Sequence, residues 1–359
     1  MAKILMKGNE AIGKAAIEAG CRYFFGYPIT PQNELPEYMS KELPNHNGVF
    51  VQAESEVSAI NMVYGGASCG KAVMTSSSSP GVSLKQEGIS FIAASELPAL
   101  VVNVMRGGPG LGTIHPSQAD YFQATKGGGH GDYHLIVLAP KTVQEMADFV
   151  YLGFDLAFKY RTPAMILADG IVGQMMEKVV LPPARPRRTK EQIAEQCPWA
   201  ITGKPATRSQ NIITSLELDT AVMEENNNRF QRTYRLIEQN EQRCEEYLTD
   251  DAEYLFVAFG SMARICQKVI DDMREQGLKV GLVRPITLWP FPTEVFDRVS
   301  QRVKGMLVVE LNAGQMIEDV KLASQCRVPT YHFGRLGGIV PNLGEISDAF
   351  FKFFPDAKK

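Results

Sequence analysis

The sequence predicts an α/β protein with two parallel sheets. Short runs of consecutive apolar residues alternate with helix-like stretches over residues 1–170, and the same alternation returns over residues 251–359. Strands of a parallel sheet are buried on both faces, so they are apolar throughout, and a helix connects one strand to the next. A chain of 359 residues has room for two such units.

Strands and helices alternate from the start of the first unit. The helix over 143–160 has the clearest pattern, because its apolar residues recur at the spacing of one helix face. Strands are expected at 22–27, 49–53, 71–75, 99–105, 135–139 and 163–167. Helices are expected at 7–19, 32–43, 54–66, 82–95 and 143–160.

Composition changes after this unit. Pro182, Pro183 and Pro186 stand among arginines, and proline cannot donate to the ladder of a central strand, so a surface linker is expected there. Residues 219–248 are strongly polar and predict one long exposed helix. Further on, strands are expected at 254–258, 280–283, 306–309 and 330–333, and helices at 262–276, 292–302, 314–325 and 343–354. The expected domains are 1–180 and 251–359, with the linker and exposed helix over 181–250.

Composition also excludes several classes of protein. The formal net charge is −3, whereas a general binder of nucleic acid needs a basic excess. No run approaches the roughly 20 apolar residues that span a bilayer. The closest two of the six cysteines, Cys244 and Cys266, are 22 residues apart, so neither an iron–sulfur cluster nor a structural zinc site is expected on this chain. Scattered single cysteines favour reduced thiols in a cytoplasmic protein.

Two polar segments follow the first two strands of the first unit. Ligands of open α/β sheets bind at the carboxyl ends of the strands. Pro28 and Pro31 stiffen the first segment, where Thr30 either caps the next helix or holds its hydroxyl rigidly at the mouth of a cleft. Glu54 and Glu56 follow the second strand; the helix dipole favours a carboxylate there, and an apolar cleft would raise its pKa and let it share a proton.

Two more polar segments follow the next two strands. Residues 75–81 (TSSSSPG) form either a cradle for a polar ligand or a plain capping loop, and they lack the glycine–lysine pattern of a nucleotide phosphate loop. Arg106 precedes a glycine-rich loop and offers a bidentate fork to a carboxylate, or forms a surface ion pair. His130 and His134 are surrounded by glycines, which disfavours the helix that would bring two metal ligands together.

Together these segments resemble the alpha subunit of the 2-oxoacid:ferredoxin oxidoreductases, and within that family the members that act on 2-oxoisovalerate. The resemblance lies in the turn Tyr27-Pro28-Ile29-Thr30-Pro31, in Glu56 after a strand and in Arg106 before the glycine loop. It extends through 283–290 (VRPITLWP) and 310–312 (ELN), and so covers the whole chain. It implies a thiamine pyrimidine-binding domain of transketolase type, followed by a domain like the transketolase C-terminal domain.

The resemblance implies thiamine diphosphate as the cofactor, bound between two chains. Glu56, rather than Glu54, corresponds to the glutamate that contacts N1′ of the aminopyrimidine. A carboxyl group there favours the 4′-imino tautomer, which can take the proton from C2 of the thiazolium. The motif Pro28-Ile29-Thr30 is implied in cofactor binding, Thr30 also in catalysis, and Arg106 in holding the substrate carboxylate.

The resemblance also implies partner subunits. The G-D-G…N-N type segment that binds diphosphate and Mg²⁺ is broken at Gly131-Asp132-Tyr133, and Asp169-Gly170 has no asparagine at a suitable distance. A beta subunit is therefore expected to hold the diphosphate, Mg²⁺ and a [4Fe-4S] cluster, beside a gamma subunit and a ferredoxin-like delta subunit. The implied reaction converts a 2-oxoacid, CoA and oxidised ferredoxin to acyl-CoA, CO₂ and reduced ferredoxin.

The substrate and the role of the chain have alternatives. Relatives acting on 2-oxoglutarate often carry Ser-Thr where this chain has Gly110-Leu111. Leu111 offers no polar partner to a distal carboxylate, and this favours a branched aliphatic substrate such as 2-oxoisovalerate over 2-oxoglutarate. A non-catalytic scaffold subunit and a nucleotide-binding protein that uses the serine loop are the rival interpretations. Residues 335–338 (RLGG) are expected to form a turn rather than a contact with CoA or a partner.

Overall fold

The first unit is built on a seven-stranded sheet in which six strands run parallel. The computed structural model describes residues 3–204, 206 and 208–358. The strand order is β12-β6-β7-β5-β4-β2-β3, and β12 alone among them pairs antiparallel. The strands are β2 (Tyr23–Gly26), β3 (Val49–Gln52), β4 (Val73–Ser77), β5 (Leu100–Met105), β6 (Ile136–Leu138), β7 (Ala164–Asp169) and β12 (Thr287–Trp289).

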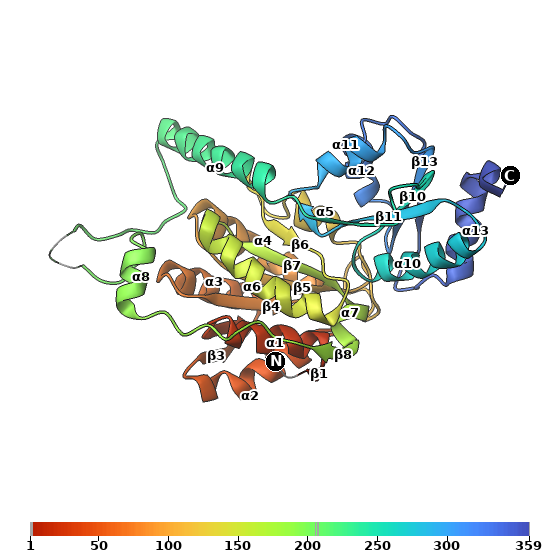
Figure 1. The fold of residues 1–359 in the computed structure, drawn as a ribbon. Coiled ribbons are helices and arrows are strands. Elements are labelled where there is room, and N and C mark those ends of the chain that lie inside the picture. The colour runs from red at the N-terminus through yellow and green to blue at the C-terminus, as the bar shows by residue number, and fades with distance from the viewer. Residues whose placement is uncertain (1–2, 205, 207, 359) are drawn as a thin grey trace.

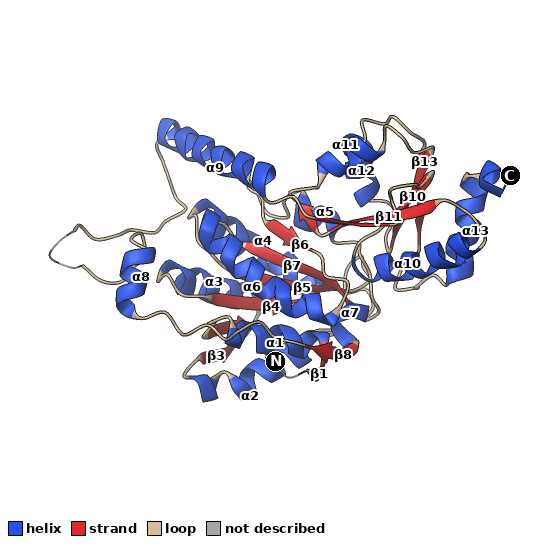
Figure 2. Cartoon of the chain, viewed as in Figure 1, coloured by secondary structure: helices blue, strands red, loops and turns tan. Residues whose placement is uncertain are grey.

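Helices cover both faces of this sheet (Figure 2). The strand order reverses direction around β2, and right-handed crossovers therefore place the connecting helices on opposite faces. One layer holds α1 (Gly8–Glu18), α2 (Glu34–Glu42) and α6 (Val143–Tyr160), which contact one another through α1; the other holds α3 (Glu56–Ser68) and α4 (Ser79–Ala94), which pack together. The shorter helices are η1 (Pro44–His46), α5 (Tyr121–Thr125), α7 (Gly170–Gln174) and α8 (Lys190–Gln196).

The second unit is a five-stranded sheet with helices around it (Figure 1). Its order is β14-β13-β10-β11-β9, parallel except for β9 at the edge. The strands are β9 (Cys244–Tyr247), β10 (Tyr254–Val257), β11 (Val280–Pro285), β13 (Gly305–Glu310) and β14 (Thr330–Gly334). The helices are α10 (Gly260–Glu275), α11 (Thr293–Val299), α12 (Met316–Ala323), α13 (Leu343–Phe353) and η2 (Pro355–Lys358).

The α/β class with two largely parallel sheets is confirmed, and several elements differ from the expectation. The polar helix expected over 219–248 ends at Asn240 as α9 (Thr220–Asn240), and the residues after it form β9. Both are polar, so composition does not separate an exposed helix from an edge strand. β1 (Ile4–Lys7) and β8 (Met176–Val179) form an unexpected antiparallel pair, and β12 leaves the second unit to join the first sheet.

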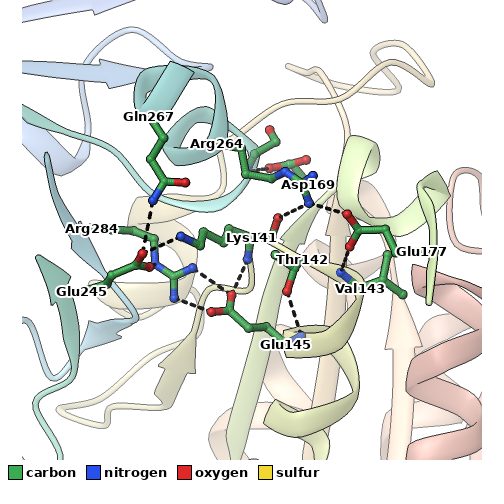
Figure 3. Close-up of polar contacts among 11 residues, drawn as sticks. Lys141, Thr142, Val143, Glu145, Asp169, Glu177, Glu245, Arg264, Gln267 and Arg284 are labelled. Carbon is green, nitrogen blue, oxygen red and sulfur yellow. Dashed lines mark hydrogen bonds and ion pairs between the residues drawn. The ribbon is translucent and has the colours of Figure 1, made fainter. Parts of the chain in front are cut away.

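Buried charges join the two units (Figure 3). Arg284 on β11 is fully buried, and its two terminal nitrogens each donate to one carboxylate oxygen of Glu145 on α6, both at 2.8 Å. Its Nε lies 3.2 Å from Oε2 of Glu245 on β9, and Lys141 contacts the other oxygen of Glu245 at 2.6 Å. Fixed charges of opposite sign therefore hold the second sheet against the first. No helix within the described part of the chain is long and apolar enough to cross a membrane.

Candidate functional site

The predicted site residues lie at one edge of the first sheet. The carboxyl ends of β2, β3, β4 and β5 meet there because these strands are parallel neighbours. Thr30 follows β2, Glu56 begins the helix after β3, and Arg106 follows β5. The edge also coincides with the point where the strand order reverses, which is where open α/β sheets form a crevice.

Glu56 is a buried carboxylate at a helix N-terminus. It is the first residue of α3, and the hydroxyl of the N-cap Ser55 accepts from the Ser58 amide at 3.3 Å. Only 6% of Glu56 is exposed, whereas Glu54 lies at the surface with Oε1 accepting from the Ser58 hydroxyl at 3.2 Å. Burial therefore separates two carboxylates that the sequence places two residues apart.

Glycine at position 81 makes room for this carboxylate. A Cβ on Gly81 would stand 2.5 Å from Glu56 Oε1 and would also overlap the Ser77 hydroxyl. The N-terminus of α4 thus presses directly on the Glu56 side chain. The hydroxyls of Ser77 and Ser78 are buried there and have no hydrogen-bond partner among the described residues. Buried polar groups normally find partners, so these hydroxyls favour a polar ligand at this place.

Arg106 links three segments of the site. Its Nη1 donates to the Thr30 carbonyl oxygen and its Nη2 to the Leu111 carbonyl oxygen, both at 2.9 Å. Its backbone N–H donates to the Ser79 hydroxyl at 3.0 Å. The guanidinium is buried, with 7% of the residue exposed, and Nε has no hydrogen-bond partner in the described structure. Arg106 is therefore not in the surface ion pair considered as its alternative role.

Thr30, on the turn after β2, is not the N-cap residue of the next helix, which was one of its two expected roles. The helix that follows begins at Glu34, with Asn33 in the N-cap position, and the Thr30 hydroxyl accepts from Asn33 Nδ2 at 3.4 Å. Thr30 and Ile29 are half-buried and Pro28 is exposed. The peptide bond between Thr30 and Pro31 is cis. The hydroxyl of Thr30 thus stays on a turn at the sheet edge.

Leu111 lies on the glycine-rich loop with its side chain in solvent. In this single chain 82% of it is exposed, while its carbonyl oxygen accepts from Arg106. Gly110 and Gly112 on either side adopt positive φ, at 68° and 61°. Only glycine takes such angles without strain, so the sequence around Leu111 fixes a sharply folded loop.

One hydroxyl of the serine loop, that of Ser79, already has a hydrogen-bond partner within the protein. The Ser79 hydroxyl donates to Asp120 Oδ2 at 2.6 Å, and Asn103 Nδ2 donates to the same oxygen at 2.8 Å. Burial raises the pKa of Asp120, and these two hydrogen bonds oppose the rise. Sequence reasoning missed Asp120, because its partners lie 17 and 41 residues away. It also missed Lys85, a fully buried lysine on α4 whose signal is a charged residue on an apolar helix face.

Other residues weighed from the sequence have structural contacts. Asp169 is buried at the end of β7; one of its oxygens caps α7 and the other accepts from the Ser261 amide at 2.9 Å. His134 stacks on Trp289 with ring centroids 4.5 Å apart, while His130 is exposed. No group of three or more potential metal ligands occurs among the residues that the structure describes.

The α/β fold is that of a protein with a thiamine-diphosphate-binding domain, as two family matches show. Residues 14–244 match the family described as pyruvate flavodoxin/ferredoxin oxidoreductase, thiamine diphosphate-binding. Residues 252–346 match the pyruvate:ferredoxin oxidoreductase core domain II. The chain belongs to this family of 2-oxoacid:ferredoxin oxidoreductases and is a subunit of such an enzyme.

Relatives at the level of whole chains agree. The ketoisovalerate oxidoreductase subunit VorB of Methanothermobacter marburgensis is 49% identical over 98% of this chain and 97% of its own length. The 2-oxoglutarate synthase subunit KorA of Archaeoglobus fulgidus is 38% identical over 92% of this chain and 95% of its own. These relatives are named as subunits, so this chain is of a kind that works in a multi-subunit complex.

Solved structures share the fold. The 2-oxoglutarate:ferredoxin oxidoreductase from Magnetococcus marinus, solved with 2-oxoglutarate, coenzyme A and succinyl-CoA bound, matches with a TM-score of 0.84 and 27% identity. It covers 98% of this chain, which spans 65% of that longer chain. A split gene transketolase matches with a TM-score of 0.60 at 14% identity, over 99% of both chains, and supports the transketolase-like fold alone.

Proposed function

We propose that this chain supplies the pyrimidine half of the thiamine site in a branched-chain 2-oxoacid:ferredoxin oxidoreductase. The observation that carries the proposal is the buried Glu56 carboxylate over Gly81, beside the unpartnered hydroxyls of Ser77 and Ser78. A carboxyl group in this setting suits the N1′ position of an aminopyrimidine, which needs one strong hydrogen bond in an otherwise enclosed place.

The described residues fit one half of the cofactor. Glu56 and the serine hydroxyls provide donors and acceptors for a flat polar ring, and Gly81 provides the space. A diphosphate with Mg²⁺ needs oxygen ligands around the metal, and the G-D-G…N-N type segment that supplies them in thiamine enzymes is broken here at Gly131-Asp132-Tyr133. A partner beta subunit is therefore assigned the diphosphate, Mg²⁺ and the electron-accepting [4Fe-4S] cluster.

Glu56 is assigned the proton chemistry of the site. Thiamine diphosphate, when bound, supplies the nucleophilic carbon that attacks the carbonyl of the 2-oxoacid. Glu56 would hold a proton at N1′ and so favour the imino form of the 4′-amino group. Pro28, Ile29 and Thr30 form the turn next to the ring, where the rigid backbone orients the Thr30 hydroxyl toward cofactor and substrate.

Arg106 is assigned the substrate carboxylate. Two of its N–H groups hold the backbone of the Thr30 turn and of the Leu111 loop, which fixes the plane of the guanidinium. The unpartnered Nε–H and the remaining N–H of a terminal nitrogen are left for a carboxylate oxygen pair. A buried guanidinium with free donors attracts an anion strongly, because few other groups there offset its charge.

The substrate is assigned as 2-oxoisovalerate. The backbone carbonyl of Leu111 contacts Arg106, and the Leu111 side chain offers no hydrogen-bond partner to a second carboxylate. The higher identity to the ketoisovalerate oxidoreductase subunits VorB of Methanothermobacter than to the 2-oxoglutarate synthase subunits KorA supports this choice. Coenzyme A accepts the acyl group, ferredoxin accepts the electrons, and gamma and ferredoxin-like delta subunits complete the complex. Turnover of the assembled complex with 2-oxoisovalerate and with 2-oxoglutarate tests the assignment, and preference for 2-oxoglutarate contradicts it.

Glu56→Gln in the assembled complex tests the central assignment. Glutamine keeps the shape and loses the proton-holding carboxyl, so exchange of the C2 proton of bound thiamine diphosphate should fall by 10²-fold or more. Glu54→Gln, exposed and two residues away, is the matched control and should leave the exchange rate unchanged. Unchanged exchange in Glu56→Gln with the complex intact would instead support the scaffold role.

A further inference from the structure

Lys85 is a fully buried lysine one helical turn beyond Gly81. It lies on α4, and 0% of the residue is exposed. Residues four apart share one face of a helix, and helical side chains point back toward the N-terminus of their helix. The Lys85 side chain therefore extends toward the turn of α4 that contains Gly81 and packs against the Glu56 carboxylate of α3.

Two glycines bring α3 and α4 close together on either side of Lys85. Gly81 faces Glu56, and a Cβ on Gly88 would stand 2.8 Å from Ile60 Cγ1. Lys85 is thus enclosed between the two helices and β4. There its Nζ donates to Thr75 Oγ1 at 3.1 Å, which uses one of its three N–H bonds.

Glu56 is the charged partner of this ammonium. Burial lowers the pKa of Lys85 to about 8, and the negative charge of Glu56 acts in the opposite direction. No other charge among the described residues contributes to this balance. The other charged groups near α3, α4 and β4 lie elsewhere. Arg106 and Asp120 make their contacts beside the end of β5, and Glu54 and Glu87 are exposed to solvent.

A buried ammonium costs stability that a methionine of similar shape would not. We propose that Lys85 is a positioning residue, whose ammonium orients the Glu56 carboxylate. The inference rests on the proposed function of Glu56. A carboxylate held in one orientation can direct its hydrogen bond to N1′, so Lys85 would fix the geometry in which the site works.

Lys85→Met in the assembled complex tests this role. The rate of C2 proton exchange should fall by about 10-fold or more, because the Glu56 carboxylate loses the cation that orients it. A Lys85→Met complex with an unchanged exchange rate would overturn the inference. If Glu56→Gln abolishes exchange while Lys85→Met leaves it unchanged, only the role of Lys85 is wrong.

The titration of Lys85 can be measured directly, without the cofactor and without the Lys85→Met variant. The full chain labelled with ¹³C at lysine Cε should show one lysine titrating near pH 8 by NMR. In Glu56→Gln that midpoint should fall by about one pH unit, because the carboxylate that favours the ammonium is gone; in Glu54→Gln it should not move. An equal midpoint in the wild type and Glu56→Gln would overturn the coupling.

Discussion

The Arg284 guanidinium donates a hydrogen bond to each carboxylate oxygen of Glu145 across the junction of the two sheets, both at 2.8 Å. Arg284 has no exposed surface, whereas 22% of the Glu145 side chain is exposed. The pair therefore places a wholly buried cation from β11 against the start of α6 (Figure 3). The same stretch of β11 leads into β12, which joins the first sheet, so this contact fixes where the second unit sits.

Removing the carboxylate of this pair should cost more stability than removing the buried cation. Glu145→Gln leaves the buried Arg284 short of a counter-charge and should destabilise the chain by about 3–5 kcal/mol. Arg284→Met removes the buried charge and should cost less. Urea denaturation measures both, with Asp155→Asn in the surface pair with Arg185 as a control below about 1 kcal/mol. A larger loss for Arg284→Met than for Glu145→Gln would contradict this account.

Gly81→Ala should displace the Glu56 carboxylate, which is proposed to be catalytic. Its Cβ would stand 2.5 Å from Glu56 Oε1, so the side chain must move and exchange of the C2 proton should fall by at least 10-fold. Gly65→Ala on α3 is the matched control, because nothing lies within 4 Å of its Cβ. That variant should keep full activity and gain about 0.5–1 kcal/mol of stability from helix propensity. Equal exchange in both variants would exclude the packing argument.

Arg106→Ala should raise the apparent KM for the 2-oxoacid by 10-fold or more while changing the affinity for thiamine diphosphate much less. The reason is that the proposed ligand of Arg106 is the substrate carboxylate, whereas the proposed ligand of Glu56 is the cofactor. Arg106→Lys should recover only part of the loss, because an ammonium cannot replace the planar fork. Steady-state kinetics and calorimetric titration of the cofactor measure the two effects. Equal losses in both quantities would show that the carboxylate assignment is wrong.

The buried charge of Lys85 should make stability depend on pH. Its pKa falls from 10.5 to about 8 on folding, so the unfolded chain binds more protons and stability rises as the pH goes from about 8 to 10.5. In a Glu56→Gln background, where the pKa of Lys85 should be about one unit lower still, Lys85→Met should therefore gain about 4 kcal/mol at pH 7. The gain should shrink toward zero near pH 10.5. The free energies of unfolding of Glu56→Gln and of the double variant with Lys85→Met, measured across this pH range, test the prediction. A difference between them that stays constant with pH would contradict the lowered pKa of Lys85.

Much of the fold follows from local pattern. The parallel strands from β2 to β7, and β10, β11, β13 and β14, lie where apolar runs predict them, because a strand buried on both faces must be apolar whatever surrounds it. Glu56 and Arg106 could be selected for the same reason, since polar residues directly after such strands lie at the carboxyl edge of a parallel sheet.

Only the tertiary structure decided which polar residues are buried and with what. β12 joins the first sheet and β9 the edge of the second through contacts between distant segments, and their short sequences carry no periodic signal. Lys85 is enclosed near Glu56 because two glycines let α3 and α4 approach closely, and Asp120 meets Ser79 across a long loop. Sequence patterns report the local burial of apolar residues, whereas the partner of a buried charge depends on how separate elements pack.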